Sequence, residues 1–202
     1  MYDQNNEDRH NPEHVPSPQG TTPASHLFRE LLNVALIAIF IVLPIRLFIA
    51  QPFIVSGSSM KPTFMDGDYL IVDQLSYRIE EPERLDVVIF RYPDDPSQFF
   101  IKRIIGLPGE TIQIGSNGVT IINEANPEGT ILKEEYIDTS HYEPFTTTLK
   151  DDEFFVLGDN RDASSDSRIW GPLNRKYLIG RAFLRLIPVP NAEVFPGKYK
   201  DY

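Results

Sequence analysis

Apolar residues follow three different patterns along this chain. Residues 1–26 are polar and carry four prolines, so we expect a disordered N-terminal tail with nothing to bury. Residues 31–50 are almost wholly apolar, interrupted by one asparagine, one proline and one arginine. From residue 51 onward, short β-branched or aromatic runs alternate with turn-forming residues, which is the pattern of β-strands.

The apolar run is long enough to cross a bilayer, because a helix of about 20 residues spans about 30 Å. A cleaved signal peptide fits less well, since the preceding region is long and acidic and no A-x-A site follows. A buried helix of a soluble protein is the other alternative. We predict a transmembrane anchor over residues 27–50, with Arg46 near the far interface.

The remaining residues, 51–202, are enough for one folded domain with its own core. Residues 111–114 and 119–122 flank a Gly-Ser-Asn-Gly turn and are typical of a β-hairpin. Residues 123–150 are polar and indicate an insertion or a small subdomain, and no helical period is evident after residue 51. The other predicted strands lie at residues 52–55, 69–72, 86–90, 99–105, 154–157 and 182–186.

Composition removes several classes of function. The formal charge of −10 argues against a nucleic-acid partner, since phosphate binding requires clustered Lys and Arg. The chain has no cysteine, which excludes disulfides and thiol nucleophiles. Three of the four histidines lie in the tail, and His141 lies in the polar insertion, where we expect a surface loop residue. No HExxH or similar ligand cluster is present, so we predict neither a metal site nor a Ser-His-Asp triad.

Lysine is then the candidate base. Lys102 lies in the apolar run of residues 99–105, and in a strand its side chain shares a face with Phe100 and Ile104. Burial against that face would lower the lysine pKa and favour the neutral amine, which can accept a proton from a hydroxyl group. The alternative is an edge-strand lysine that prevents aggregation, and the strand alone does not decide between the two.

Ser59 is the candidate nucleophile. It follows the strand at residues 52–55 in a Gly-Ser turn, although such a segment is often a turn with no other role. Ser58 and Lys61 match the S-x-x-K pattern of penicillin-binding enzymes. That pattern requires a helix, which Pro62 disfavours, and partner motifs that this chain lacks.

A charged loop follows the apolar strand at residues 154–157. We expect its charges to pair among themselves and its serines, Ser164 especially, to orient a neutral lysine amine. Its charged residues are Asp159, Arg161, Asp162, Asp166 and Arg168.

Four segments in order carry a specific resemblance: residues 56–63 (SGSSMKPT), 84–90 (RLDVVIF), 102–109 (KRIIGLPG) and 158–168 (GDNRDASSDSR). With the preceding anchor, the chain resembles type I signal peptidases (peptidase S26), membrane-bound Ser-Lys proteases that remove signal peptides from exported proteins. The resemblance covers the anchor and nearly all of residues 51–190.

The resemblance implies a mainly β fold: an antiparallel β catalytic domain of the signal peptidase and Ser-Lys autoprotease type, with a small β insertion at about 110–152. It implies that Ser59 is the nucleophile, Lys102 the general base and Ser164 the hydroxyl that orients the lysine. Residues that would support the site are Asp159, Arg161, Asp166 and Arg168.

The implied partners are signal peptides of exported preproteins and membrane lipid, with no metal, cofactor or nucleic acid. The catalytic domain of a single-pass protein would lie on the extracytoplasmic side of the cell membrane. By their offset from Ser59, several bulky residues should line shallow pockets for alanine-sized side chains at substrate positions −1 and −3. They are Phe53, Val55, Met60, Phe64 and Ile101.

Two residues depart from the family pattern. Gly57 stands where some members have a serine that assists the oxyanion hole, and Leu85 replaces the usual glycine of the second motif. Two alternative functions are a related self-cleaving repressor and a membrane-tethered β domain without catalysis. The anchor and the absence of predicted DNA-binding helices argue against the first, and the presence of both Ser59 and Lys102 argues against the second.

Overall fold

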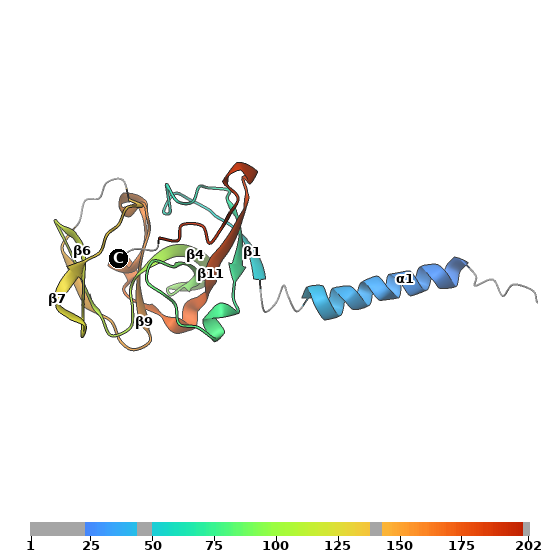
Figure 1. Ribbon diagram of the computed structural model, residues 1–202, viewed down its shortest axis with the longest axis horizontal. Coiled ribbons are helices and arrows are strands. Elements are labelled where there is room, and N and C mark those ends of the chain that lie inside the picture. Colours follow the sequence, from blue (N-terminus) through green and yellow to red (C-terminus); the bar gives the residue numbers. More distant parts are fainter. Residues whose placement is uncertain (1–22, 44–49, 138–142, 200–202) are drawn as a thin grey trace, which may run out of the picture. The chain divides into compact units, whose positions relative to one another are not determined.

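The computed structural model describes residues 23–43, 50–137 and 143–199. The chain forms two compact units, Met1–Val42 and Leu43–Tyr202. The first unit contains helix α1 (Pro23–Ile37), which continues as the π-helical segment η1 (Ala38–Val42) (Figure 1).

The predicted anchor at residues 27–50 coincides in part with this helix. Residues 44–49 lie outside the described ranges. In the described portion of the chain, no helix combines the length and the apolar character needed to cross a membrane.

The second unit is built on two antiparallel sheets, which confirms a mainly β fold (Figure 1). The larger sheet has the order β1-β2-β11-β3-β4-β9-β10, and β12 pairs with β11. Its strands contain the β-branched and aromatic runs expected from the sequence. They are β1 (Ala50–Ile54), β2 (Tyr69–Asp73), β3 (Val87–Tyr92), β4 (Asp95–Gly106), β9 (Glu153–Leu157), β10 (Leu173–Asn174), β11 (Leu178–Ile187) and β12 (Glu193–Val194).

The smaller sheet has the order β7-β6-β5-β8. Strands β5 (Thr111–Gly115) and β6 (Gly118–Asn123) pair with Gly115 opposite Gly118, which confirms the predicted hairpin. The polar segment after the hairpin contains two further strands, β7 (Asn126–Ile131) and β8 (Phe145–Thr148). Both lie at the edges of this sheet, where one face and one side can remain in water, so their polar composition is compatible with strand structure.

Helical structure in the second unit consists of single turns. They are η3 (Ser76–Arg78), η4 (Arg161–Ala163), α2 (Ser167–Trp170), η5 (Arg175–Tyr177) and η6 (Val189–Asn191). Helix α2 begins after Asp166, whose side chain accepts a hydrogen bond from the backbone N–H of Arg168. Such short turns have no helical period, which explains why the hydrophobic pattern did not predict them.

Buried apolar side chains form three clusters in this unit. One joins the two sheets through residues such as Ile105, Ile112 and Phe155. A second packs beneath the loop that follows β1 and includes Met60 and Phe64. Ile101 of β4 packs against the second cluster, which therefore holds the loop after β1 against β4.

Leu85 lies in the first cluster with a φ of 69°, in the left-handed region that favours glycine. Its backbone N–H donates to the Ile104 carbonyl at 2.8 Å, and its own carbonyl accepts from Arg103 at 2.9 Å. The backbone conformation therefore accounts for the glycine that the second motif usually carries here. In this chain a leucine adopts the conformation and fills the core instead.

We expect Leu85→Ala and Leu85→Gly to lower the free energy of unfolding by similar amounts, each about 2–5 kcal/mol. Glycine loses one more buried carbon, but it relieves the left-handed strain that alanine retains. Leu157, equally buried in β9 without a positive φ, is the matched control. There the glycine variant should be less stable than the alanine variant by roughly 0.5–1 kcal/mol, because glycine loses more conformational freedom on folding into a strand. Urea unfolding of the four variants measures these free energies. The prediction is contradicted if the difference between the glycine and alanine variants is the same at positions 85 and 157.

Candidate active site

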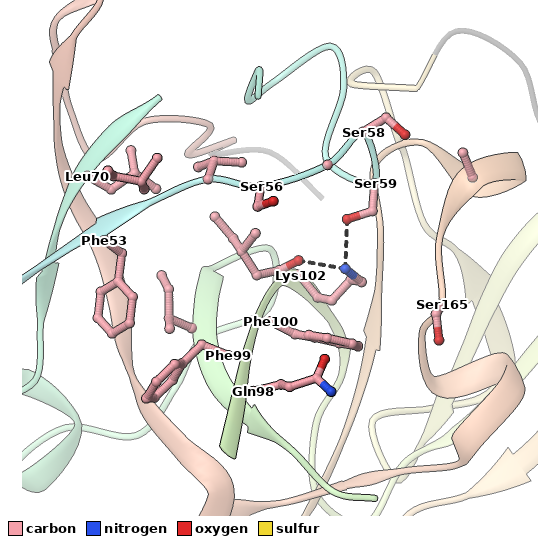
Figure 2. A pocket seen from close by; sticks show the side chains of 16 residues that line it. Phe53, Ser56, Ser58, Ser59, Leu70, Gln98, Phe99, Phe100, Lys102 and Ser165 are labelled. Atoms are coloured by element: carbon pink, nitrogen blue, oxygen red, sulfur yellow. Dashed lines mark hydrogen bonds between the residues drawn. The ribbon is translucent and has the colours of Figure 1, made fainter. Parts of the chain in front are cut away.

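Ser59 is held in the loop between β1 and β2. The backbone N–H of Gly57 donates to Oδ1 of Asp66 at 2.8 Å, and Asn160 donates its backbone N–H to the Ser59 carbonyl at 3.0 Å. Gly57 has a φ of 95°, so a serine at this position would be strained. The loop after β9 therefore fixes Ser59 through its backbone and leaves the hydroxyl group exposed to the groove (Figure 2).

Lys102 reaches Ser59 from β4. Its Nζ atom lies 2.8 Å from Oγ of Ser59 and 2.9 Å from the Ile101 carbonyl oxygen, as the dashed lines in Figure 2 show. Only 4% of the residue is exposed to solvent. The strand alternation predicted from sequence also holds, since Arg103 and Lys102 make different contacts: Arg103 bonds to Asp159, Leu85 and Gly197.

Burial lowers the pKa of Lys102 from its usual value to about 8, because the charged amine is removed from water. The carboxylates of Asp166 and Asp159 oppose this shift. The Phe100 ring, 5.3 Å from Nζ, also favours the charged form. Desolvation outweighs both effects, so a substantial fraction of the amine is neutral near pH 8.

A groove of about 410 Å³ runs past both residues, and Figure 2 shows its lining side chains. Phe53, Val55 and Ile101 line it, as expected from their offsets. Met60 and Phe64 do not line it, because both are buried in the cluster beneath the loop. Further lining residues that sequence reasoning missed include Leu70, Ile89, Gln98, Phe99, Phe100, Ala163 and Ser165.

The charged loop after β9 is ion-paired, both within itself and with partners outside it. Asp166 pairs with Arg168 within the loop. Asp159 instead accepts two hydrogen bonds from Arg103, at 2.8 and 2.6 Å, and both side chains are fully buried. The expectation that the loop pairs its charges among themselves is therefore wrong for Asp159. A carboxylate that is fully buried away from water needs a counter-charge beside it, and Arg103 of β4 supplies that charge.

Arg161 also pairs outside the loop, with Glu134 from the segment between β7 and β8. The hydroxyl of Tyr136 donates to the same carboxylate at 2.7 Å, and the Tyr136 ring lies 4.1 Å from the Arg103 guanidinium. The insertion therefore contributes directly to the support of the site. Sequence reasoning missed both residues, and nothing in their local pattern distinguishes them.

Ser164 lies close to the site. A Cβ atom placed on Gly158 would be 2.3 Å from the Ser164 hydroxyl oxygen and 2.5 Å from the Ser59 carbonyl oxygen, so the two residues pack against the same backbone position. The Ser164 hydroxyl is buried and has no hydrogen-bond partner among the residues that the structure describes. His141, expected on a surface loop, lies outside the described residues.

Several known proteins are similar to this chain. The crystal structure of a signal peptidase I from Enterococcus faecalis is similar over 51% of this chain and 97% of that one, with 30% identity and a TM-score of 0.43. A probable signal peptidase I-2 from Synechocystis is 38% identical over 175 residues, covering 84% of this chain and 78% of the relative. Signal peptidase I from Leptolyngbya laminosa is 39% identical over 161 residues, covering 76% of each chain.

The sequence profile of the family described as "Signal peptidase, peptidase S26" matches residues 28–187, which is most of the chain. With relatives of this identity and coverage, the chain belongs to the signal peptidase family, peptidase S26.

Proposed function

We propose that this protein is a serine endopeptidase that removes signal peptides from exported preproteins, with Ser59 as nucleophile and Lys102 as general base. The observation that carries the proposal is the 2.8 Å contact between Nζ of Lys102 and Oγ of Ser59 at the floor of an open groove. A serine hydroxyl is a weak nucleophile until a base accepts its proton. A buried amine with a lowered pKa is such a base.

The reaction proceeds through an acyl-enzyme. The neutral Lys102 amine accepts the Ser59 proton as Oγ attacks the scissile carbonyl carbon. The ammonium group then donates this proton to the leaving amine as the peptide bond breaks. In the second half of the reaction, Lys102 accepts a proton from a water molecule that attacks the ester, and it returns the proton to Oγ of Ser59 as the ester bond breaks. The backbone N–H of Ser59 stabilises the oxyanion, since Gly57 has no hydroxyl group to offer. The expected hydrogen bond from Ser164 to the Lys102 amine is not formed among the described residues, so the mechanism assigns the orientation of the amine to Ser59 and the Ile101 carbonyl.

The groove suits an extended peptide. Residues 53–59 line one side and residues 98–102 the other. In the described sheet, β1 pairs with β2 alone, and the register of β9 on β4 begins at Arg103. Backbone groups of both groove walls can therefore pair with a substrate strand. Phe53, Val55 and Ile101 leave room for small side chains at positions −1 and −3 of the substrate.

Membrane lipid is the second proposed partner. We propose that residues 27–50 serve as a single-pass anchor, of which the described helix forms only a part, and that the β unit acts at the extracytoplasmic membrane surface. Two apolar side chains beside the groove support this, because Ile54 is 67% exposed and Phe99 is 42% exposed. Exposed apolar groups next to a binding groove favour contact with lipid acyl chains over contact with water.

Incubating the detergent-solubilised protein with a preprotein should give one new N-terminus, directly after small residues at −1 and −3. Sequencing the product measures this. A matched preprotein with phenylalanine at −1 should be cleaved at least about tenfold more slowly, because the pocket walls are bulky. Absence of cleavage would contradict the proposed function. Equal cleavage of both preproteins would contradict the proposed specificity for small side chains.

A further inference from the structure

The last described residues, Phe195–Tyr199, lie beyond residue 187, where the family profile ends. We refer to them as the C-terminal segment. The Lys198 N–H donates to the Phe195 carbonyl at 3.1 Å, and Gly197 between them has a φ of 73°. Proline followed by a glycine with positive φ is typical of a type II turn. The segment is therefore a defined turn.

The segment is attached to β11 at its start. The Phe195 N–H donates to the Phe183 carbonyl at 2.7 Å, and the two rings contact each other edge to face at 5.2 Å. The Arg181 guanidinium lies 4.9 Å from the Phe195 ring. These contacts hold the turn against the larger sheet, so Gly197 has a fixed position.

From that position the segment contacts the buried arginine of the site. The Gly197 carbonyl accepts a hydrogen bond from Nη1 of Arg103 at 2.5 Å. The Tyr199 ring lies 5.2 Å from the guanidinium and 5.0 Å from the Tyr136 ring, which covers the same guanidinium. The other bonds of Arg103 go to Asp159 and to the Leu85 carbonyl.

Asp159 connects these contacts to the nucleophile loop. Its Oδ2 atom accepts a hydrogen bond from the Thr63 hydroxyl at 2.5 Å, and the next residue, Asn160, donates to the Ser59 carbonyl. A displacement of Arg103 would therefore be transmitted through Asp159 to the residues that hold Ser59.

We propose that the C-terminal segment is a positioning element for the active site. It holds Arg103 against Asp159 and thereby keeps Nζ of Lys102 within hydrogen-bond distance of Oγ of Ser59. The proposal rests on the proposed function for its effect on cleavage. It adds a role for residues that lie outside the part of the chain shared with the family profile.

The charges around Lys102 give the proposal a second consequence. The carboxylates that act on Lys102 are Asp159 and Asp166, both from the loop after β9. Each has an arginine partner, Arg103 and Arg168 respectively. On the remaining sides, β3 places Val88 opposite Lys102 and the loop after β1 contributes the uncharged Ser59. If Arg103 leaves Asp159, the carboxylate is less neutralised and water can enter, and both changes raise the lysine pKa.

Gly197→Ala tests the proposal, because it adds a single Cβ atom to the turn. The added Cβ would lie 2.6 Å from Cγ2 of Thr63 and 3.2 Å from Nη2 of Arg103, at a φ that disfavours alanine. The turn or Thr63 must then shift, and each of them bonds to one member of the Arg103–Asp159 pair. We expect kcat to fall by about 10- to 100-fold with KM nearly unchanged, since small displacements far from the reacting atoms are enough for such losses. The acid limb of the kcat profile should move to higher pH.

Gly118→Ala is the matched control. Its φ is 101°, and a Cβ there meets no atom within 4 Å, in the hairpin of the smaller sheet. It carries the same kind of backbone strain and should leave kcat and the pH profile unchanged. Tyr199→Ala should lower kcat, whereas Tyr199→Phe should keep the wild-type kcat, because the ring and not the hydroxyl group covers Arg103.

A readout independent of cleavage separates this proposal from the proposed function. The pKa of Lys102, measured by NMR on lysine-labelled protein, should rise in Gly197→Ala and stay unchanged in Gly118→Ala. If the wild type fails to cleave a preprotein but this shift occurs, the proposed function is wrong and the positioning role stands. If folded Gly197→Ala shows wild-type kcat and an unshifted Lys102 pKa, the segment only stabilises the fold and the proposal is overturned.

Discussion

Ser59→Ala and Lys102→Met are each expected to lower kcat for preprotein cleavage by about 10⁴- to 10⁶-fold, the range seen when one member of a nucleophile-base unit is removed. The two residues act on the same proton, so the double variant should be no worse than either single variant. Lys61→Met is the matched control, because Lys61 is exposed and lies only two residues from Ser59. It should retain activity. Single-turnover kinetics measures all four variants, and a strong loss in Lys61→Met would favour the S-x-x-K alternative.

The same arrangement fixes the pH dependence of the wild type. Lys102 acts only when neutral, and burial lowers its pKa to about 8. Activity should therefore rise about tenfold between roughly pH 7 and pH 9 as the neutral fraction grows. A rate that is flat over this range would show that another group accepts the proton.

Stability distinguishes a base from a structural lysine. The unfolded chain keeps a proton that the folded state tends to release, so wild-type stability falls as pH drops from the unfolded pKa near 10.4 to the folded pKa of about 8, and is constant below it. At neutral pH the lowered pKa of Lys102 costs the folded wild type roughly 3 kcal/mol of stability. Lys102→Met avoids this cost and loses only two hydrogen bonds, worth about 1 kcal/mol each. Lys102→Met should therefore be inactive yet at least as stable as wild type at pH 7. A clearly lower melting temperature would mean that the lysine is charged and paired.

Local signals made Lys102 and Ser59 candidates, but the strand and the turn alone left other roles open, and the resemblance carried by four ordered segments assigned the pair. Lys102 interrupts a β-branched and aromatic run, and Ser59 stands in a turn directly after a strand. Strand alternation was enough to separate the directions of Lys102 and Arg103. The strands themselves follow from the same local alternation, and the structure confirms them.

The support of the site could not be predicted, because it depends on contacts between distant segments. Arg161 bonds to Glu134 across 27 positions, and Arg103 bonds to Gly197 across 94. Met60 and Phe64 were predicted as pocket walls from their offset from Ser59 along the chain. The loop instead turns back on itself, as the hydrogen bond from the Phe64 N–H to the Met60 carbonyl shows, and it buries both side chains.

Arg103 makes many contacts around the site, yet it is inconspicuous in the sequence. It directly follows Lys102, and alternation points it away from the reacting atoms. Its side chain is nevertheless fully buried, bonded to a carboxylate, two carbonyls and, through its faces, two tyrosine rings. A cation in such a place is stable only while every one of these partners stays in position. We therefore expect the geometry of the site and the stability of the fold to depend on the same residue.

Arg103→Met should accordingly lower the free energy of unfolding by about 3–5 kcal/mol, because it leaves the Asp159 carboxylate buried without its counter-charge. Arg175→Met is the matched control: Arg175 is ion-paired with Glu81, but that pair is largely exposed, and its loss should cost less than about 1 kcal/mol. Adding Asp159→Asn to Arg103→Met should recover part of the loss, since the uncompensated charge is then gone. Urea unfolding measures all three variants. If Arg103→Met is no more harmful than Arg175→Met, water must reach Asp159 easily, and the network of Arg103, Asp159 and the C-terminal segment cannot be the rigid support described above.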